Sequence, residues 1–299
     1  MRKPLKILSI IFLIVFVILL SLAFVVGVFI NKTLEKETNE DLPFFQSIKM
    51  ALTLNFEGEN ERQLKENRLK EQHHHISIYY PDDFSELIPV TKETLDWAIN
   101  KNEEIFGTVK VKAVDLIVFK DKDELNELSE LIDISGFYSD FDKLLSIRYN
   151  YKEMILEKKE TPLYFFQKSI LHEYTHYTFN RMVEGSEFGT SVYPIWFQEG
   201  ISEYIGNDKA IVEYSDFKLV PFSQLVNGEQ WQTARFQEGA NVYRQSYFAI
   251  KYLIDIYGEE VLGKIIKESN STGDFEGSFI QTTGISIQDL ENVFLNSYK

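Results

Sequence analysis

The pattern of apolar and polar residues changes along the chain and divides it into three stretches. Residues 7–30 are a run of 24 residues without a charge, dominated by Ile, Leu, Val and Phe. Residues 31–72 are mostly polar and charged, with a patchy apolar pattern at 42–56 that is typical of a short amphipathic helix. From residue 73 onward the apolar positions follow the periods of strands and helices, so we expect the folded body at 73–299.

Short apolar runs rich in β-branched and aromatic residues come first in this body, and helical periods follow. The predicted strands cover 76–80, 114–119, 144–151 and 154–156. The predicted helices cover 91–106, a segment at 161–185, and segments near 221–227, 239–257, 259–269 and 286–298. This order predicts an α+β fold, in which a mixed-sheet lobe precedes a helical C-terminal lobe and a cleft lies between the two.

The helix expected at 161–185 has a clear core-facing side. Its start is indicated by Thr161 followed by proline, and its end by Gly185. Apolar residues recur at steps of three and four, at Leu163, Phe166, Ile170, Tyr174 and Tyr177. Two histidines fall on a different face from this stripe, so that face is available to line the cleft.

These histidines belong to the segment H-E-Y-T-H at residues 172–176. His172 and His176 are four residues apart, about 400° around a helix, and therefore lie on one face one turn apart. Two imidazoles bind one Zn²⁺ in this arrangement, with Glu173 beside the metal as the general base. The alternatives are a buried histidine pair satisfied by hydrogen bonds and a solvated helix face.

A catalytic zinc takes three protein ligands and a water, so a further ligand is needed. The chain contains no cysteine, and its other histidines lie at 73–75, so a carboxylate is the best remaining candidate. Glu199 supplies one in a second predicted helix after Pro194, and Glu203 follows on the same face. If Glu199 binds zinc, Glu203 is placed to accept a hydrogen bond from a ligand imidazole and fix its tautomer. The alternative is an ordinary acidic helix face.

Two segments, L-H-E-Y-T-H-Y at 171–177 and W-F-Q-E-G-I-S-E-Y at 196–204, together resemble the gluzincin zinc peptidases. Within that group the chain is most similar to the peptidase MA-like domains of bacterial membrane-associated proteins. The resemblance begins near 75–81, reaches 243–250 and the closing helices, and covers about three quarters of the chain. It implies a thermolysin-like two-lobed zincin fold, one zinc ion per chain and hydrolysis of peptide bonds in a peptide or protein substrate.

By motif position, the resemblance implies His172, His176 and Glu199 as zinc ligands and Glu173 as the catalytic residue. In such enzymes an edge strand beside the site pairs with extended substrate, and we assign that role to 154–156. No substrate is implied, and endopeptidase and aminopeptidase activities both stay open. The alternatives are a zinc-containing binding module without turnover and a purely structural module. Glu173 favours an enzyme, because a structural zinc site does not need it.

Peptide hydrolysis also needs a hydrogen-bond donor for the developing oxyanion. Tyr243 and Tyr247 share one face of the helix expected at 239–257. Tyr243 is our first candidate for this donor, with Tyr247 beside it and Arg244 as a more remote choice. The alternative for both tyrosines is core packing with the hydroxyl satisfied.

The apolar run at 7–30 is long enough to span a bilayer as a helix. Basic residues precede it at Arg2, Lys3 and Lys6, and no acidic residue occurs before Glu35. The positive-inside rule therefore predicts a cytoplasmic tail at residues 1–6, a signal anchor, a charged membrane-proximal segment and an extracytoplasmic peptidase domain. The alternative is a cleaved signal peptide, whose apolar region is normally shorter, at 7–15 residues.

The charge balance bears on the partners of the chain. Asp and Glu number 46 against 31 Lys and Arg, for a net charge of −15. A surface this acidic is repelled by phosphate backbones, so we expect no nucleic-acid partner. The absence of cysteine means that the fold contains no disulfide framework and depends on its hydrophobic core.

The histidine run at 73–75 could itself bind a metal. Adjacent side chains of a strand point to opposite faces, so only His73 and His75 could converge on one metal. Without a further ligand in the sequence pattern, we interpret this run as the polar start of a strand.

Overall fold

The computed structural model describes residues 3–38, 42–53, 58–129 and 131–298. The chain divides into two units, Met1–Asn67 and Arg68–Lys299, which are described one after the other. The division falls a few residues before the start of the body predicted from the sequence.

The N-terminal unit contains α1 (Lys3–Thr38), α2 (Phe44–Thr53) and α3 (Glu59–Glu66). Within α1, the described segment Phe12–Lys36 has a mean hydropathy of 3.3 and is long and apolar enough to cross a membrane. A signal sequence meets the same criteria, so length and composition do not separate the two. The Asn31 amide, near the end of α1, donates hydrogen bonds to the carbonyl of Leu42 and the hydroxyl of Ser47, which ties α1 to the segment that starts α2.

The second unit contains a five-stranded mixed sheet with the strand order β1-β2-β3-β5-β4. Its strands are β1 (Leu69–His73), β2 (Ile76–Tyr80), β3 (Val114–Phe119), β4 (Gly136–Ser139) and β5 (Leu144–Arg148). The central strands β2, β3 and β5 run parallel to one another, and each edge strand is antiparallel to its neighbour. The predicted strands at 76–80 and 114–119 are confirmed at both ends.

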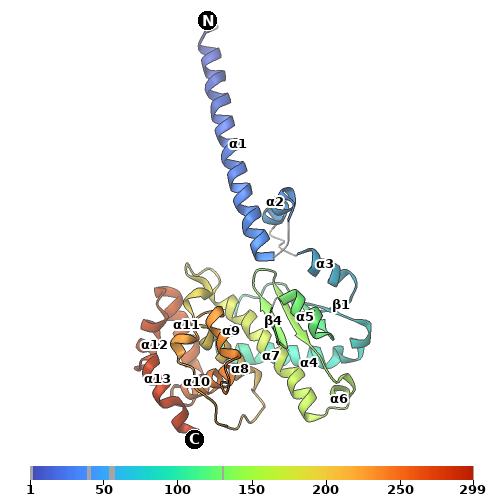
Figure 1. Cartoon of the computed structure of the whole chain (residues 1–299), viewed down its shortest axis with the longest axis vertical. Helices are drawn as coiled ribbons and strands as arrows, with labels where there is room; N and C mark the ends of the chain where they lie inside the picture. The colour runs from blue at the N-terminus through green and yellow to red at the C-terminus, as the bar shows by residue number, and fades with distance from the viewer. Residues whose placement is uncertain (1–2, 39–41, 54–57, 130, 299) are drawn as a thin grey trace. The chain divides into compact units, whose positions relative to one another are not determined.

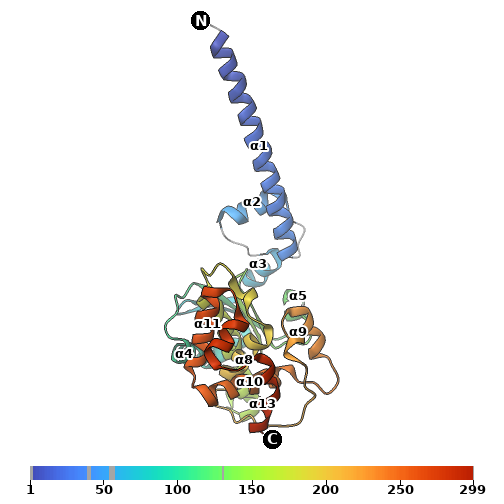
Figure 2. The same ribbon diagram turned by 90° about the vertical axis from the view of Figure 1, so that its left-hand side faces the viewer.

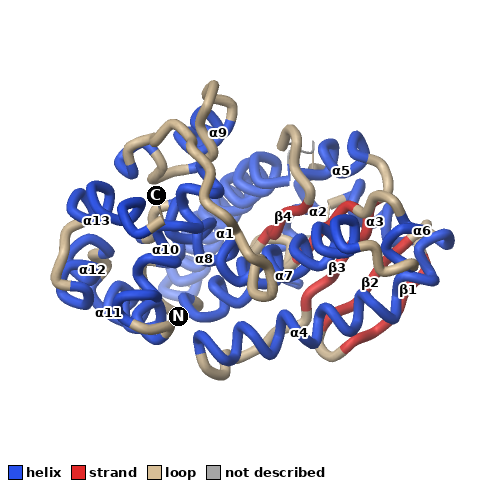
Figure 3. The backbone as a smooth tube through the Cα atoms, turned by 90° about the horizontal axis from the view of Figure 1, so that it is seen from below, coloured by secondary structure: helices blue, strands red, loops and turns tan. Residues whose placement is uncertain are grey.

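Helices make up most of the remaining chain, as the sequence predicted for its C-terminal part. They are α4 (Ile88–Phe106), α5 (Lys122–Ser129), α6 (Lys152–Leu156), α7 (Glu160–Val183), α8 (Ile195–Gly206), α9 (Gly228–Arg235), α10 (Val242–Tyr257), α11 (Glu260–Thr272), α12 (Phe275–Thr283) and α13 (Ile287–Val293). The strands lie on one side of α7, and α8 and α10 to α13 lie on the other (Figures 1 and 3). Figure 2 shows the helical side, with α10, α11 and α13 facing the viewer. The α+β prediction is confirmed.

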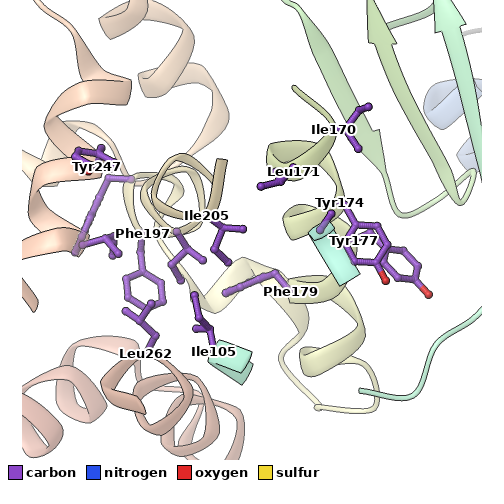
Figure 4. Packing of buried hydrophobic residues seen from close by; sticks show 14 of the residues in the cluster. Ile105, Ile170, Leu171, Tyr174, Tyr177, Phe179, Phe197, Ile205, Tyr247 and Leu262 are labelled. Atoms are coloured by element: carbon purple, nitrogen blue, oxygen red, sulfur yellow. The ribbon is translucent and has the colours of Figure 1, made fainter. Parts of the chain in front are cut away.

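Helix α7 is the central element because it is buried on several sides. Ile170, Tyr174 and Tyr177 lie on its side next to the sheet, as the predicted stripe requires (Figure 4). Leu171 and Phe179, also buried, point toward α8 and the helical part (Figure 4). A helix that is apolar around much of its circumference is typical of a core position. The sheet and the C-terminal helices therefore meet on the helix that carries the histidine pair.

Two strand predictions differ from the structure, one in the type of element and the other only in where the strand ends. Residues 154–156 belong to the short helix α6, where the Met154 amide bonds to the Tyr151 carbonyl at 2.9 Å. A three-residue apolar run fits a helical turn as well as a strand, and periodicity cannot separate them. The strand predicted at 144–151 ends at Arg148.

Several elements were missed because their patterns are weak. Strand β1 includes residues 69–72, which the sequence assigned to the polar membrane-proximal segment; as an edge strand it keeps polar side chains exposed. Helices α5, α9 and α12 and strand β4 are short, and no expected element corresponds to them. The helix predicted near 221–227 is only the 3₁₀ turn Phe222–Gln224.

Candidate metal centre

Helix α7 brings the two motif histidines together. The Nε2 atoms of His172 and His176 lie 3.1 Å apart, and both side chains are largely buried. Their spacing follows directly from the helical turn between them. Each ring thus turns one nitrogen toward the same point.

Helix α8 adds a carboxylate to this point. The two carboxylate oxygens of Glu199 lie 3.3 Å from Nε2 of His172 and 3.7 Å from Nε2 of His176. One ligand atom from each residue falls within 4.8 Å of the others. Zinc–ligand bonds of about 2.0–2.1 Å in a tetrahedron place neighbouring ligand atoms about 3.3 Å apart. The donor set and its spacing therefore fit a zinc ion.

The position of Glu199 depends on close packing of α8. A Cβ atom added to Gly200 would lie 2.7 Å from both the Ser246 carbonyl oxygen and the Ile250 side chain of α10. Only a residue without a side chain lets the two helices approach this closely. The neighbouring Trp196 and Phe197 are buried and anchor the same helix. The carboxylate is therefore presented to α7 from a rigid support.

Glu203 lies one turn further along α8, behind the histidine pair. Its carboxylate oxygens lie 3.2 Å from Nδ1 of His172 and 2.7 Å from the Lys168 ammonium. Burial raises the pKa of Glu203, but hydrogen bonds from His172 and the charge of Lys168 outweigh it and lower the pKa to about 2. A carboxylate at Nδ1 holds the proton there, which leaves the Nε2 lone pair of His172 for a metal.

Glu173 lies on the other side of the centre, against the edge strand β4. A Cβ atom added to Gly136 would lie 2.9 Å from the Glu173 carboxylate and 2.6 Å from the Ser146 carbonyl oxygen. Burial raises the pKa of Glu173, partly offset by the nearby histidines. A raised pKa makes a carboxylate a better proton acceptor near neutral pH.

Two hollows of about 220 and 240 Å³ open onto the centre. The residues that line both are Ile134, Gly136, His172, Glu173, Arg235 and Tyr243. The rings of Tyr243 and His172 lie 6.4 Å apart, edge to face. Burial, with the charge of Glu199, raises the pKa of Tyr243, so its hydroxyl stays protonated and can donate a hydrogen bond.

The other two candidate donors lie further from the centre. Tyr247 is buried, stacks on Tyr204 with ring centroids 6.3 Å apart, and lines neither of the two hollows. Arg244 donates to the backbone carbonyl of Glu213. Both line a larger hollow of about 990 Å³ that also reaches Tyr243. Of the three, Tyr243 is the residue that the fold brings to the histidines.

The family model described as Collagenase matches residues 91–290, about two thirds of the chain. The chain belongs to the collagenase family. Collagenases of this family are zinc metallopeptidases, so a protease with a zinc cofactor and a peptide or protein substrate is the family's expectation for this chain. The matched span includes most of α4 and the helices that carry the histidine pair and Glu199.

Two relatives place this member of the collagenase family among known proteins. Uncharacterized protein YhcO of Bacillus subtilis (strain 168) is 33% identical over 242 residues, which are 81% of this chain and 75% of that protein. Microbial collagenase of Vibrio vulnificus (strain CMCP6) is 25% identical over 118 residues, and the match spans 38% of this chain but 14% of the collagenase. A solved structure of Legionella pneumophila aminopeptidase A in complex with aspartic acid is 12% identical, with a TM-score of 0.47 over 73% of this chain and 26% of that one.

Sequence reasoning missed two residues of this collagenase-family site. Gly136 begins the unpredicted strand β4, so its signal, a glycine within a strand that marks a close approach of another group, could be read only once the strand was known. Arg235 carried none, because it ends the unpredicted helix α9. Its guanidinium donates to the Asp133 carbonyl at 2.9 Å and faces the Tyr243 ring at 5.5 Å. The site therefore contains a cation that the motif spacing did not reveal.

Proposed function

We propose that this chain is a membrane-anchored gluzincin zinc peptidase that hydrolyses peptide bonds. His172, His176 and Glu199 would hold one zinc ion, and the body would have the thermolysin-like two-lobed arrangement. The observation that carries the proposal is the convergence of two Nε2 atoms and one carboxylate at 3.1–3.7 Å. Glu173, buried beside this point, adds a group that a purely structural site does not need.

A bound zinc would supply a Lewis acid for the scissile carbonyl and lower the pKa of a bound water. Glu173 would accept the proton of the attacking water and pass it to the departing amine nitrogen. Glu203 would hold the His172 ring in the required tautomer. Tyr243 would donate its hydroxyl proton in a hydrogen bond to the oxyanion that develops on the substrate.

The edge strand β4 is the better candidate for substrate pairing than residues 154–156. It pairs with β5 on one side, it is half-buried along its length, and it begins at Gly136 against Glu173. An extended peptide bound to such an edge gains main-chain hydrogen bonds with limited side-chain selectivity. The scissile bond would then lie beside Glu173 and the two hollows.

The compartment that we propose rests on the N-terminal unit. We propose that α1 is an uncleaved anchor, with residues 1–6 in the cytoplasm and the peptidase domain at 73–299 outside the cell membrane. Substrates would then be proteins at the outer face. The apolar segment Phe12–Lys36 and the basic residues before it support this topology.

Metal analysis of the full chain purified in detergent tests the centre. His172→Ala and Glu199→Ala should each lose the zinc bound there, because two ligands do not retain it. Glu173→Gln should keep the zinc but cleave gelatin about 10²–10⁴-fold more slowly, the usual contribution of a general base. Zinc retained at the centre in both ligand variants would refute the assignment. Zinc bound with no cleavage by the wild type would instead support the binding module without turnover.

A further inference from the structure

The histidine run at 73–75 lies at the tight turn between β1 and β2. His73 pairs with Ile76 in the antiparallel register, so His74 and His75 alone form the turn. His74 adopts a left-handed backbone conformation, with φ of 51°. Asparagine and glycine are the usual residues at such positions. Histidine is also among the non-glycine residues that adopt this conformation more often, so His74 fits the turn.

The imidazoles of His73 and His74 both point at one carboxylate of α4. The Oδ1 atom of Asp96 lies 2.7 Å from Nε2 of His73 and 2.8 Å from Nε2 of His74. A ligand atom from each of the three residues falls within 4.8 Å of the others. The two rings are 4.3 Å apart, nearly edge to face. Two nitrogens and one oxygen therefore converge at a second place in the fold.

This result corrects the prediction that, of the three histidines, only His73 and His75 could converge. His75 turns the other way, stacking on Tyr177 with ring centroids 5.4 Å apart and placing Nε2 3.3 Å from the Tyr174 hydroxyl. The alternation of a strand no longer applies after His73, because β1 ends there and the left-handed turn redirects His74. The missing ligand was Asp96, which lies far away in the sequence.

We propose that His73, His74 and Asp96 form a second transition-metal site, separate from the candidate catalytic centre. Two imidazoles and a carboxylate suit Zn²⁺, Ni²⁺, Co²⁺ or Cu²⁺ rather than Mg²⁺ or Ca²⁺. The side chains of His74 and Asp96 are about half exposed, at 56% and 48%, so an ion reaches them from solvent and keeps water on its remaining positions.

The electrostatics around Asp96 favour a cation at this point. Among the described residues, the ion-pair partners of Asp96 are the two histidines, and nearby Lys92 is paired with Glu71 at 2.6 Å instead. No lysine or arginine ion pair neutralises Asp96 in the described part of the chain.

A metal here would join the β1–β2 turn to helix α4. The turn belongs to the edge strand β1, and Asp96 lies within the long helix α4. The ion would tie that turn to the helix. We therefore assign the site a stabilising role for the β1 edge and no part in peptide hydrolysis.

Zinc binding to variants of the full chain in detergent tests this proposal. In a His172→Ala/His176→Ala background, which lacks the candidate catalytic centre, equilibrium dialysis should still find about one zinc per chain. Adding His74→Asn or Asp96→Asn should remove it; asparagine accepts the left-handed turn, and the Asp96 side chain is only half-buried. His75→Phe is the matched control, because it preserves the ring stack on Tyr177 and should leave zinc binding unchanged.

The outcomes separate this proposal from the proposed function. No zinc bound by the double-alanine background, or binding that His74→Asn and Asp96→Asn leave unchanged, overturns the second site. In the otherwise unchanged chain, His74→Asn should lower the zinc content from about two to about one per chain and leave gelatin cleavage intact. Loss of cleavage together with that zinc would show that the turn site serves catalysis, which contradicts the proposal. Circular dichroism confirms that each variant is folded.

Discussion

The two histidine clusters of this chain use similar ligands in opposite surroundings. The pair on α7 is largely buried, receives Glu199 from a neighbouring helix, and has Glu203 behind one imidazole. The pair at the β1–β2 turn is more exposed and shares a single oxygen of Asp96. In the described residues, no second carboxylate supports its rings. Ligand type alone thus does not distinguish a catalytic centre from a surface site; burial, supporting hydrogen bonds and an adjacent base do.

After Glu173→Gln, replacing the candidate oxyanion donor should give the largest effect on turnover at the buried centre. Tyr243→Phe should reduce kcat by about 10²–10³-fold, the usual cost of one such donor, without changing zinc content. Tyr247→Phe is the control, since Tyr247 lines neither hollow at the centre, and it should retain nearly full activity. Equal kcat in wild type and Tyr243→Phe would remove Tyr243 from the mechanism.

The supporting carboxylate is the next point of difference between the clusters. Glu203→Gln should weaken zinc binding at the centre by about 10–100-fold, because the His172 ring loses the group that sets its tautomer. Competition with a chromogenic chelator measures this zinc affinity. The His74→Asn background is used because it leaves only the centre to bind zinc. Glu160→Gln, at the exposed start of α7, is the matched control. An affinity as tight as that of the parent would mean that Glu203 does not orient the ring.

The buried centre also differs from the open turn site in its close packing against β4. Gly136→Ala places a methyl 2.6 Å from a backbone carbonyl of the sheet and 2.9 Å from Glu173. We expect a loss of about 1–3 kcal/mol in the free energy of unfolding and about a tenfold lower kcat with zinc retained. A Cβ atom added to Gly263 in α11 would have no neighbour within 4 Å, so Gly263→Ala should change neither the free energy of unfolding nor kcat. Unaltered kinetics in Gly136→Ala would show that β4 and Glu173 are not coupled.

At the turn site the expected effect is on stability rather than on turnover. In the His172→Ala/His176→Ala background, zinc at about 100 times its Kd should stabilise the fold by about 2.7 kcal/mol. That corresponds to roughly 5–10 °C in the Tm of a domain this size. Differential scanning fluorimetry should show this rise, and the added His74→Asn substitution should abolish it. A Tm that rises equally in both proteins would place the stabilising zinc elsewhere.

Prediction from sequence succeeded where the signal is local. The strand bounds at 76–80 and 114–119, the core stripe of α7 and the shared face of His172 and His176 all follow from periods of two or 3.6 residues. It failed where an element is short or at an edge, as with β4 and residues 154–156. Such segments are stabilised by neighbours that their own sequence does not contain.

By itself the sequence determined a helix that sets two imidazoles one turn apart, a glutamate between them, and an apolar N-terminal helix. These depend on helical periodicity and hydrophobicity, which neighbouring residues decide. The tertiary structure alone decided that Glu199 lies within 3.7 Å of both imidazoles, that β4 packs on Glu173, and that Asp96 meets the turn histidines. Such contacts join residues far apart in the chain, and the packing of a shared core, rather than any local preference, sets their distances.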